Sequence, residues 1–290
     1  MTQQANAFYI ALIGFGEAGR AFAKGWGPAW GAQVTAFDLK GSDAALAAAA
    51  RRHGVDLASD RAQALSGADH VFCLVTADQA RIAAAQCAPH LAPGTLWFDC
   101  NSCAPDTKRA AAELIGAAGG LYVDTAVMAP VYPRLHETPL LISGPGAERA
   151  EPFLAAMGMQ ARRLGDRVGD ASAVKMLRSV MIKGMEALHA ECFLAARRAG
   201  VEDEVLGSLA ASNPEIDWPR QGGYNLERMM QHGLRRAAEM REVVVMLRDL
   251  GFAGDVSAAV ADWHERIGAM GLKEAEGGLI ERADKVLDRL

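Results

Sequence analysis

One predicted helix places two lysines and a serine on a single face, within VGDASAVKMLRSVMIKGMEAL (residues 168–188). Lys175 and Lys183 are eight residues apart, which is about two helical turns, and Ser179 lies midway between them. The dipole at a helix start and a second ammonium group nearby both lower a lysine pKa toward neutrality. A lysine with a lowered pKa can exchange a proton with a substrate oxygen. We therefore expect Lys175 to act as a general acid/base and Ser179 to orient that oxygen.

A solvated helix face is the alternative for this pair of lysines, because most lysines in proteins face water. The apolar neighbours Val174, Leu177 and Val180 weigh against it. Lys183 has two open interpretations. It contacts the substrate or modulates the first lysine, or it forms an ordinary helical ion pair with Glu186, three residues later.

A glycine-rich segment, IGFGEAGR, has the spacing G-x-G-x-x-G between a predicted strand and a predicted helix. In this pattern Gly14 permits a tight turn, Gly16 lets the backbone approach a pyrophosphate, and Gly19 lets helix and strand pack closely. The helix start offers N–H groups and a partial positive charge to the phosphates. A tight turn without a ligand is the alternative. The predicted cofactor contacts are Gly14, Phe15, Gly16, Glu17, Ala18, Gly19, Asp38, Val75, Thr76 and Asn101.

Asp38 bears on the choice of cofactor. It follows Gly19 by nineteen residues, at the end of the second predicted strand. A carboxylate there accepts hydrogen bonds from ribose hydroxyls and repels a 2′-phosphate, so NAD is the expected cofactor. Lys40, two residues later, could attract a phosphate and leaves NADP possible.

Strand–helix alternation positions these residues up to about residue 165. Near-continuous apolar runs at 9–14, 33–38, 70–75, 96–99, 121–127 and 139–143 predict strands that are buried on both faces. Alanine-rich segments between most of them predict helices, which implies a doubly wound, mostly parallel sheet of the Rossmann type. Asp99 and Asp124 end strands on the cofactor side, and each could equally cap a following turn.

From Asp170 onward the pattern changes to helical periodicity, at about 171–199, 201–212, 224–250, 255–270 and 272–289. We therefore predict an α/β domain followed by an all-α domain. An NAD(P)-binding Rossmann domain spans residues 1–166, and an all-helical substrate and dimerisation domain spans 167–290, with a long helix joining them. Trp218 falls in EIDWPRQGGYN, a Pro/Gly-rich segment that predicts a loop able to cover a cleft.

The composition is that of a globular protein, with 51% hydrophobic and 22% charged residues among 290. A net charge of −5 with scattered basic residues argues against a nucleic-acid partner. The apolar runs are shorter than the ~20 residues that span a bilayer, and the polar first residues differ from a signal peptide. We expect a cytoplasmic protein without a membrane partner. The five cysteines, Cys100 and Cys103 among them, lack zinc-site spacing, so we expect reduced thiols and no metal.

Four segments together resemble the 6-phosphogluconate dehydrogenase-like superfamily, and within it the β-hydroxyacid dehydrogenases. IGFGEAG is similar to its dinucleotide loop, FDCNSCAP (98–105) to an aspartate with a Ser-Thr pair and a proline, VDTAVMAP (123–130) to D-x-P-V-S-G-G, and GDASAVKMLRS (169–179) to G-x-G-x-x-x-K-x-x-N-N. The resemblance covers residues 9–190 well and the rest in outline. It implies that Lys175 is the catalytic lysine and that the protein is a homodimer through its helical domain. MAPVYPRLHETPLLISG further resembles a sparsely characterised branch whose C-terminal domain has no assigned function.

Departures from the family pattern bear on the substrate. Met128-Ala129-Pro130 stands where the family holds a substrate carboxylate with Ser-Gly-Gly, and proline has no N–H. Ser179 replaces an asparagine, Asn101-Ser102 replaces the Ser-Thr pair, and His232 aligns with a second lysine. These changes imply a substrate that is bulkier or less anionic than a simple 3-hydroxy acid. The expected substrate contacts are Ser102, Val127, Met128, Ala129, Lys183 and His232.

We therefore expect an NAD(P)-dependent oxidoreductase that transfers hydride between nicotinamide and a secondary alcohol or carbonyl of a small molecule. Ile182 stands where 6-phosphogluconate enzymes have a glutamate for decarboxylation, so a simple reversible oxidation is expected. An imine reductase on the same scaffold is one alternative, although enzymes of that type dispense with the lysine. A dinucleotide-binding regulatory protein without turnover is the other.

Overall fold

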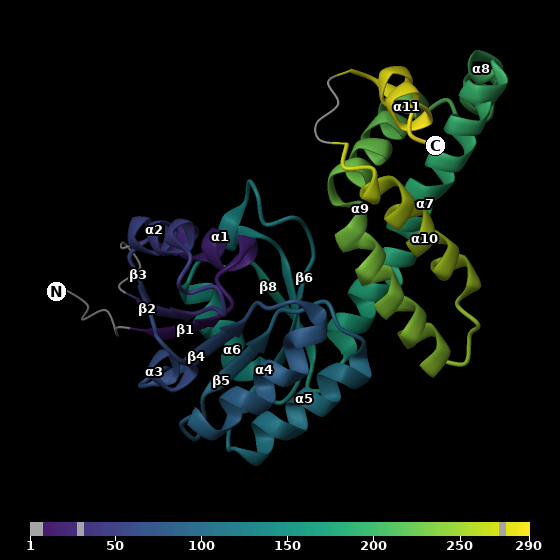
Figure 1. Ribbon diagram of the computed structural model, residues 1–290. Helices are drawn as coiled ribbons and strands as arrows, with labels where there is room; N and C mark the ends of the chain where they lie inside the picture. The colour runs from purple at the N-terminus through teal and green to yellow at the C-terminus, as the bar shows by residue number, and fades with distance from the viewer. Residues whose placement is uncertain (1–7, 28–31, 273–276) are drawn as a thin grey trace. The chain divides into compact units, whose positions relative to one another are not determined.

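A computed structural model describes residues 8–27, 32–272 and 277–290 of the chain (Figure 1). The chain divides into two compact units, Met1–Lys175 and Met176–Leu290, which are called here the N-terminal unit and the helical unit. The division falls inside a long helix, α7 (Asp170–Ala199), whereas the boundary expected from the sequence at 166/167 precedes that helix.

An eight-stranded sheet forms the centre of the described N-terminal unit, in the order β3-β2-β1-β4-β5-β6-β7-β8. The strands are β1 (Tyr9–Ile13), β2 (Gln33–Phe37), β3 (Val55–Leu57), β4 (His70–Cys73), β5 (Leu96–Asp99), β6 (Leu121–Val127), β7 (Leu140–Ser143) and β8 (Ala161–Gly165). Neighbouring strands are parallel except β6 and β7, which confirms the predicted mostly parallel sheet. The strand order reverses between β1 and β4, and doubly wound sheets bind ligands outside the carboxyl ends of their strands at such a point.

Helices cover both faces of this sheet (Figure 1). One hydrophobic cluster joins the sheet to α1 (Glu17–Trp26), α2 (Ala44–Arg52) and α6 (Ala147–Ala156). The cluster on the other face includes residues of α3 (Arg61–Leu65), α4 (Ala80–Cys87) and α5 (Pro105–Ala117). The short 3₁₀ helices are labelled η2 (Ala77–Gln79), η3 (Ala88–His90) and η4 (Leu135–Glu137). Because successive residues of a strand face opposite ways, the buried strands β1, β4, β5 and β6 contribute to both clusters.

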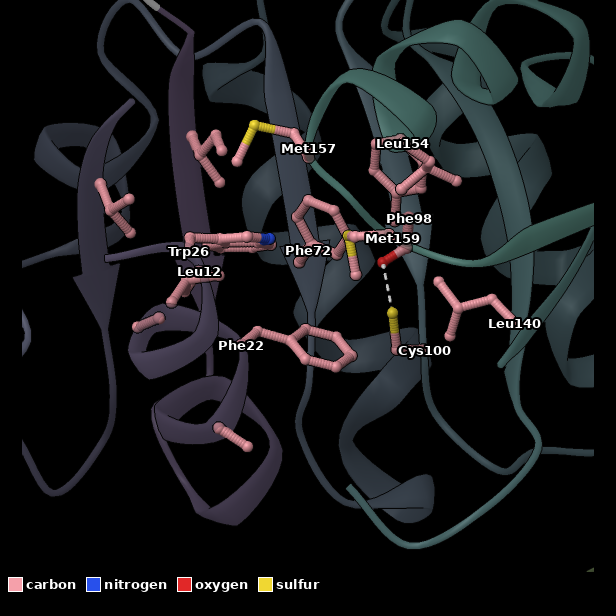
Figure 2. Packing of buried hydrophobic residues seen from close by; sticks show 14 of the residues in the cluster. Leu12, Phe22, Trp26, Phe72, Phe98, Cys100, Leu140, Leu154, Met157 and Met159 are labelled. Atoms are coloured by element: carbon pink, nitrogen blue, oxygen red, sulfur yellow. Dashed lines mark hydrogen bonds between the residues drawn. The ribbon is translucent and has the colours of Figure 1, made fainter. Parts of the chain in front are cut away.

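Aromatic residues fill the first cluster (Figure 2). Phe72 and Phe98, on the neighbouring strands β4 and β5, stack with ring centroids 4.5 Å apart. Phe22 and Trp26 of α1 pack beside Phe72. The helix whose N-terminus follows the glycine-rich turn is therefore fixed to the middle of the sheet.

In the part of the chain that the structure describes, five helices follow the sheet: α7, α8 (Glu202–Ser212), α9 (Trp218–Asp249), α10 (Asp255–Ala269) and α11 (Leu279–Leu287). The described part of the helical unit is thus all-helical, as predicted. The backbones of α9 and α10 approach closely, because a Cβ on Gly233 would lie 2.3 Å from the carbonyl oxygen of His264. None of the described helices combines the length and apolar character that a membrane-crossing segment needs.

The prediction of a loop around Trp218 was wrong, since α9 begins at that residue. The Asp217 side chain caps the helix by accepting a hydrogen bond from the Arg220 N–H, and Pro219 suits the first turn, where no N–H is needed. Gly222 is required by packing, because the Phe193 ring would lie 2.5 Å from a Cβ there. The helix predicted over 272–289 begins at Leu279, and residues 273–276 of that segment lie outside the described residues.

Candidate active site

The glycine-rich turn between β1 and α1 lies beside the end of β4. Gly14 has φ +96°, and a Cβ there would lie 2.6 Å from the Leu74 carbonyl oxygen, so only glycine fits. A Cβ on Gly19 would lie 2.7 Å from the Gly14 carbonyl oxygen, so α1 packs directly on the turn. A Cβ on Gly16 would meet nothing within 4 Å. The space over Gly16 and the N-terminus of α1, which no side chain caps, fits a pyrophosphate.

Asp38 follows β2 and holds this turn in place. Its Oδ2 accepts a hydrogen bond from the Phe15 N–H at 2.8 Å, and its Oδ1 accepts one from the Lys40 N–H at 2.9 Å. A carboxylate oxygen has two acceptor positions, so each can accept a further bond from a ribose hydroxyl. Asp38 therefore has a structural role that the sequence did not predict, in addition to its expected role at the cofactor.

The residues predicted after β4 and β5 lie at the same edge of the sheet as the turn. Val75 follows β4, and its N would lie 3.1 Å from a Cβ on Gly14; the exposed Thr76 comes next. Asn101 is buried and joins the two strand ends, because its side-chain amide donates to Asp99 Oδ1 at 2.7 Å and to Cys73 Sγ at 3.3 Å.

Lys175, on the second turn of α7, contacts the segment that follows β5. Its Nζ donates a hydrogen bond to Ser102 Oγ at 2.7 Å. Both residues belong to the N-terminal unit. The structure thus places the expected acid/base next to Asn101-Ser102, which follows the sheet edge that carries the dinucleotide turn.

A buried ion cluster that the sequence did not predict lies beneath this edge. Lys108 of α5 is fully buried, and its Nζ lies 2.7 Å from the Asp99 carbonyl oxygen, 3.1 Å from Asp99 Oδ1 and 3.4 Å from Asp124 Oδ1. Burial alone would lower the pKa of Lys108, but the Asp99 and Asp124 carboxylates raise it above its usual value. Lys108 is therefore a fixed cation between the end of β5 and the middle of β6; the expectation that Asp124 ends a strand was wrong, because β6 continues to Val127. Tyr122 completes the cluster by donating to Asp99 Oδ2 at 2.6 Å.

The same cluster fixes the start of α7. Asp124 Oδ2 accepts hydrogen bonds from the Gly169 N–H at 3.1 Å and from the Ser172 N–H at 3.0 Å. The Ala171 N–H donates to Ser143 Oγ on β7 at 3.1 Å. The first N–H groups of a helix have no partner within the helix, so buried strand side chains satisfy them here. Lys175 follows Ala171 by one turn, and its position therefore depends on these bonds.

A sequence signal for Lys108 existed. Lys108, Ala111 and Ile115 have the i, i+3, i+7 spacing of one helix face, and all three are buried. A lysine among apolar residues on such a face indicates a buried partner. Two aspartates in predicted strands, Asp99 and Asp124, were available as that partner.

The segment after β6 presents apolar surface. Val127 ends β6, and the Met128 N–H donates to the Pro139 carbonyl oxygen at 2.9 Å. The Met128 side chain packs against the small apolar cluster of Ala126, Leu141 and Ala171. Ala129 is half-buried and Pro130 is exposed, without an N–H. Backbone donors for a carboxylate are therefore scarce in this segment.

Three predicted site residues belong to the helical unit: Ser179, Lys183 and His232. Lys183 is buried, and its Nζ lies 2.7 Å from Glu239 Oε2 of α9 and 3.3 Å from Ser179 Oγ. The alternative in which Lys183 pairs with Glu186 is wrong, because Glu186 binds Arg236 of α9 at 2.6 and 2.7 Å. His232 lies half-buried on α9.

The cysteines are free thiols, and all except Cys192 are buried. Burial raises the pKa of Cys100 to about 12, so this thiol stays protonated and unreactive at neutral pH. Among the residues that the structure describes, no group of three or more His, Cys, Asp or Glu side chains is placed to hold a metal ion.

Several known proteins are similar to this chain. A solved conserved hypothetical protein from Sinorhizobium meliloti is 36% identical, with a TM-score of 0.80 over 99% of this chain and 98% of that one. A 3-hydroxyisobutyrate dehydrogenase from Pseudomonas aeruginosa is 27% identical over 72% of this chain and 71% of its own. The 3-hydroxyisobutyrate dehydrogenase of Mycobacterium tuberculosis shares the fold, with a TM-score of 0.75 and 20% identity over 91% of this chain and 94% of that one.

Two family models match separate parts of the chain. Residues 196–267 match a domain of unknown function (DUF1932). Residues 9–165, more than half of the chain, match the model described as the NAD binding domain of 6-phosphogluconate dehydrogenase. With the fold, the glycine-rich turn and the long helix after the sheet, this match shows that the chain belongs to the 6-phosphogluconate dehydrogenase-like family of NAD-binding proteins.

Proposed function

We propose that this protein is an NAD(P)-dependent oxidoreductase that interconverts a secondary alcohol and a carbonyl in a small-molecule substrate. The contact between Lys175 Nζ and Ser102 Oγ carries the proposal, because it holds an amine at the sheet edge where the dinucleotide turn lies. When bound at that turn, the nicotinamide dinucleotide accepts or supplies the hydride. Lys175 takes the proton from the substrate oxygen during oxidation and returns it during reduction.

Other residues would hold the reactants. Glu17, Ala18 and Gly19 would offer the N–H groups of the first turn of α1 to the pyrophosphate, with Phe15 and Gly16 in the turn before it. Val75, Thr76 and Asn101 would flank the nicotinamide, and Ser102 would keep the Lys175 amine in place. Ser179, one turn after Lys175, would orient the substrate oxygen.

The substrate class follows from the segment after β6. The Met128 N–H is already bonded to the Pro139 carbonyl oxygen, and Pro130 has no N–H. This segment therefore favours an uncharged or bulky substrate group over a small carboxylate. Val127, Met128 and Ala129 would contact that group. In the helical unit His232 would contact substrate, whereas the ion pair with Glu239 gives Lys183 a supporting role.

We further propose NAD as the preferred cofactor, a cytoplasmic location and a homodimer. The Asp38 carboxylate supports NAD, since it would repel a 2′-phosphate. The helical unit exposes large apolar side chains, including Met181 and Leu188, seven residues apart on α7. A contact with a second copy would cover such a stripe.

Lys175→Met tests the mechanism. Hydroxy acids, aldehydes, ketones and cyclic imines would first be screened with NADH and NADPH to find a turned-over substrate. We then expect kcat to fall by about 10²–10⁴ in this variant, the usual contribution of an acid/base group, while the Kd for NADH is unchanged. Lys285→Met, at an exposed lysine of α11, is the matched control. Unchanged kcat in Lys175→Met would remove the proposed mechanism and leave the imine reductase in its place. A wild-type protein that binds NADH but turns over none of these substrates would indicate a regulatory protein.

A further inference from the structure

Helix α9 carries more positive charge than its surroundings neutralise. Four basic residues extend along one side of the helix, because their spacings of four, three and one residues keep them on the same face: Arg228, His232, Arg235 and Arg236. Lys183 of α7 adds a fifth basic group through its contact with Glu239. Two carboxylates, Glu186 and Glu239, bind three of these groups.

Among the three arginines and Lys183, the pairing leaves one cation over. Arg236 takes both oxygens of Glu186, at 2.7 and 2.6 Å. Glu239 accepts from Arg235 at 2.8 Å and from Lys183 at 2.7 Å. Glu227, next to Arg228 in sequence, binds Arg282 at 2.6 Å. Each of these three carboxylates is therefore already bound to another cation.

Arg228 is that cation. It forms no ion pair or hydrogen bond with any residue that the structure describes, and its Nε is buried without a hydrogen-bond partner. Burial, and then the neighbouring Arg236, lower the pKa of Arg228, and the nearby Tyr224 and Glu186 offset part of this effect. A guanidinium has five N–H donors in a planar fork that matches two oxygens of a carboxylate or phosphoryl group. A half-buried cation beside other cations is unfavourable until an anion neutralises it.

We infer that Arg228 is an anion-binding residue of the helical unit and takes the carboxylate or phosphoryl group of a small ligand. Arg235 and Arg236 add positive potential to the site, and His232 lies one turn from Arg228 on α9. The site is defined by charges within the helical unit and does not depend on the hydride transfer proposed above.

Thermal unfolding of the full chain tests the inference. Tm would be measured with saturating NADH, which would occupy the proposed pyrophosphate site, at constant ionic strength in sodium chloride, with increasing inorganic phosphate in one series and malonate in another. We expect a saturable rise in wild-type Tm with at least one of these anions beyond the chloride series, and the more effective anion identifies the ligand chemistry. In Arg228→Met we expect this rise to disappear and the Tm in chloride to stay equal or increase.

Two further variants make the result specific. Arg241→Met removes an exposed arginine of the same helix that binds Glu265, and it should keep the wild-type response. Arg228→Lys retains the charge but not the planar fork, and it should shift the half-saturating anion concentration upward by about tenfold. The inference would be overturned if phosphate and malonate raised the wild-type Tm no more than chloride does. It would also be overturned if the Tm of Arg228→Met were lowered in chloride and still rose with the anion. NADH binding should be unchanged throughout, which separates this outcome from a failure of the proposed function.

Discussion

At the scale of single residues, glycines of one motif have different physical requirements. Gly14 and Gly19 are required by the protein itself, because a Cβ at either position would collide with backbone. Gly16 has a negative φ, with φ −74° and ψ −150°, and open space where its Cβ would be. We propose that glycine is needed there because the ligand would approach the backbone closely.

Two alanine substitutions separate these requirements. Gly16→Ala should leave Tm within about 2 °C of wild type and raise the Kd for NADH by at least about tenfold, because the new methyl group occupies the pyrophosphate space. Gly19→Ala should lower Tm by several degrees, since α1 must move away from the Gly14 carbonyl oxygen. Differential scanning fluorimetry and NADH fluorescence titration measure the two effects. Equal loss of stability in both variants would contradict this assignment.

At the scale of elements, a single buried lysine joins α5, the strands β5 and β6, and the start of α7. Lys108 forms ion pairs with both Asp99 and Asp124, which pair in register on β5 and β6. Asp99 in turn holds Asn101, and Asp124 holds the first turn of α7. The geometry of Ser102 and Lys175 thus depends on a residue that touches neither of them in the contacts described above.

Lys108→Met tests this dependence. Leaving two carboxylates buried without their cation should reduce the free energy of unfolding by about 3–5 kcal/mol. Arg109→Met is a matched control on the neighbouring position, because its ion pair with Asp106 is exposed, at 51% and 60%, and should change stability by less than about 1 kcal/mol. Urea unfolding followed by circular dichroism provides both values. Similar losses in the two variants would show that Lys108 is not the central cation.

The sequence predicted the elements with strong patterns and missed those without. The buried strands β1, β4 and β5 are apolar runs and were predicted. The edge strands β3 and β8 were missed, because VDL is three residues long and ARRLG is polar, as edge strands often are. The prediction of the α9 start failed for a related reason. Pro219 and Gly222 are loop residues by composition, but their first-turn and packing roles depend on tertiary context.

The candidate site was partly predictable for the same physical reasons. Local rules indicated the glycine turn, Asp38 and Lys175, since each depends on spacing within one strand–turn–helix unit or one helix. The Glu239 partner of Lys183 lies 56 positions further along the chain, and nothing near Lys183 indicates it. Arg228 has no ion-pair partner because the nearby carboxylates bind other cations, and these pairings are determined only when the chain folds.

At the scale of the whole molecule, buried histidines make stability depend on pH. His264 is fully buried beside Glu186, Lys183 and Arg236, and burial lowers its pKa to about 4 from 6.5. The unfolded chain therefore binds a proton below pH 6.5 that the folded chain does not. The contribution of His264 to stability is complete above pH 6.5 and is lost as pH falls from 6.5 toward 4. Glu186 acts in the opposite sense, because burial raises its pKa.

Replacing His264 tests its effect on the pH dependence of stability separately from the effect of the Glu186 carboxylate. Between pH 7.5 and pH 5, His264→Gln should lose less unfolding free energy than the wild type, by roughly 2 kcal/mol at most. The reason is that only the wild type has the buried histidine, which takes up a proton more readily when the chain unfolds. Glu186 remains in both proteins, so its opposite effect largely cancels. His90→Gln, at an exposed histidine, is the control. Urea unfolding at the two pH values gives the comparison, and parallel pH profiles for wild type and His264→Gln would contradict the prediction.

The order of the strands has a consequence for how the chain is made. Every described strand is complete by Gly165, and the side chains that fasten the start of α7 to the sheet lie before Lys175. Domains fold as units, the N-terminal one first during synthesis. The dinucleotide turn can therefore form on the ribosome while the helical unit is still being translated. A nascent chain would then capture its cofactor, and be stabilised by it, before the other half of the protein exists.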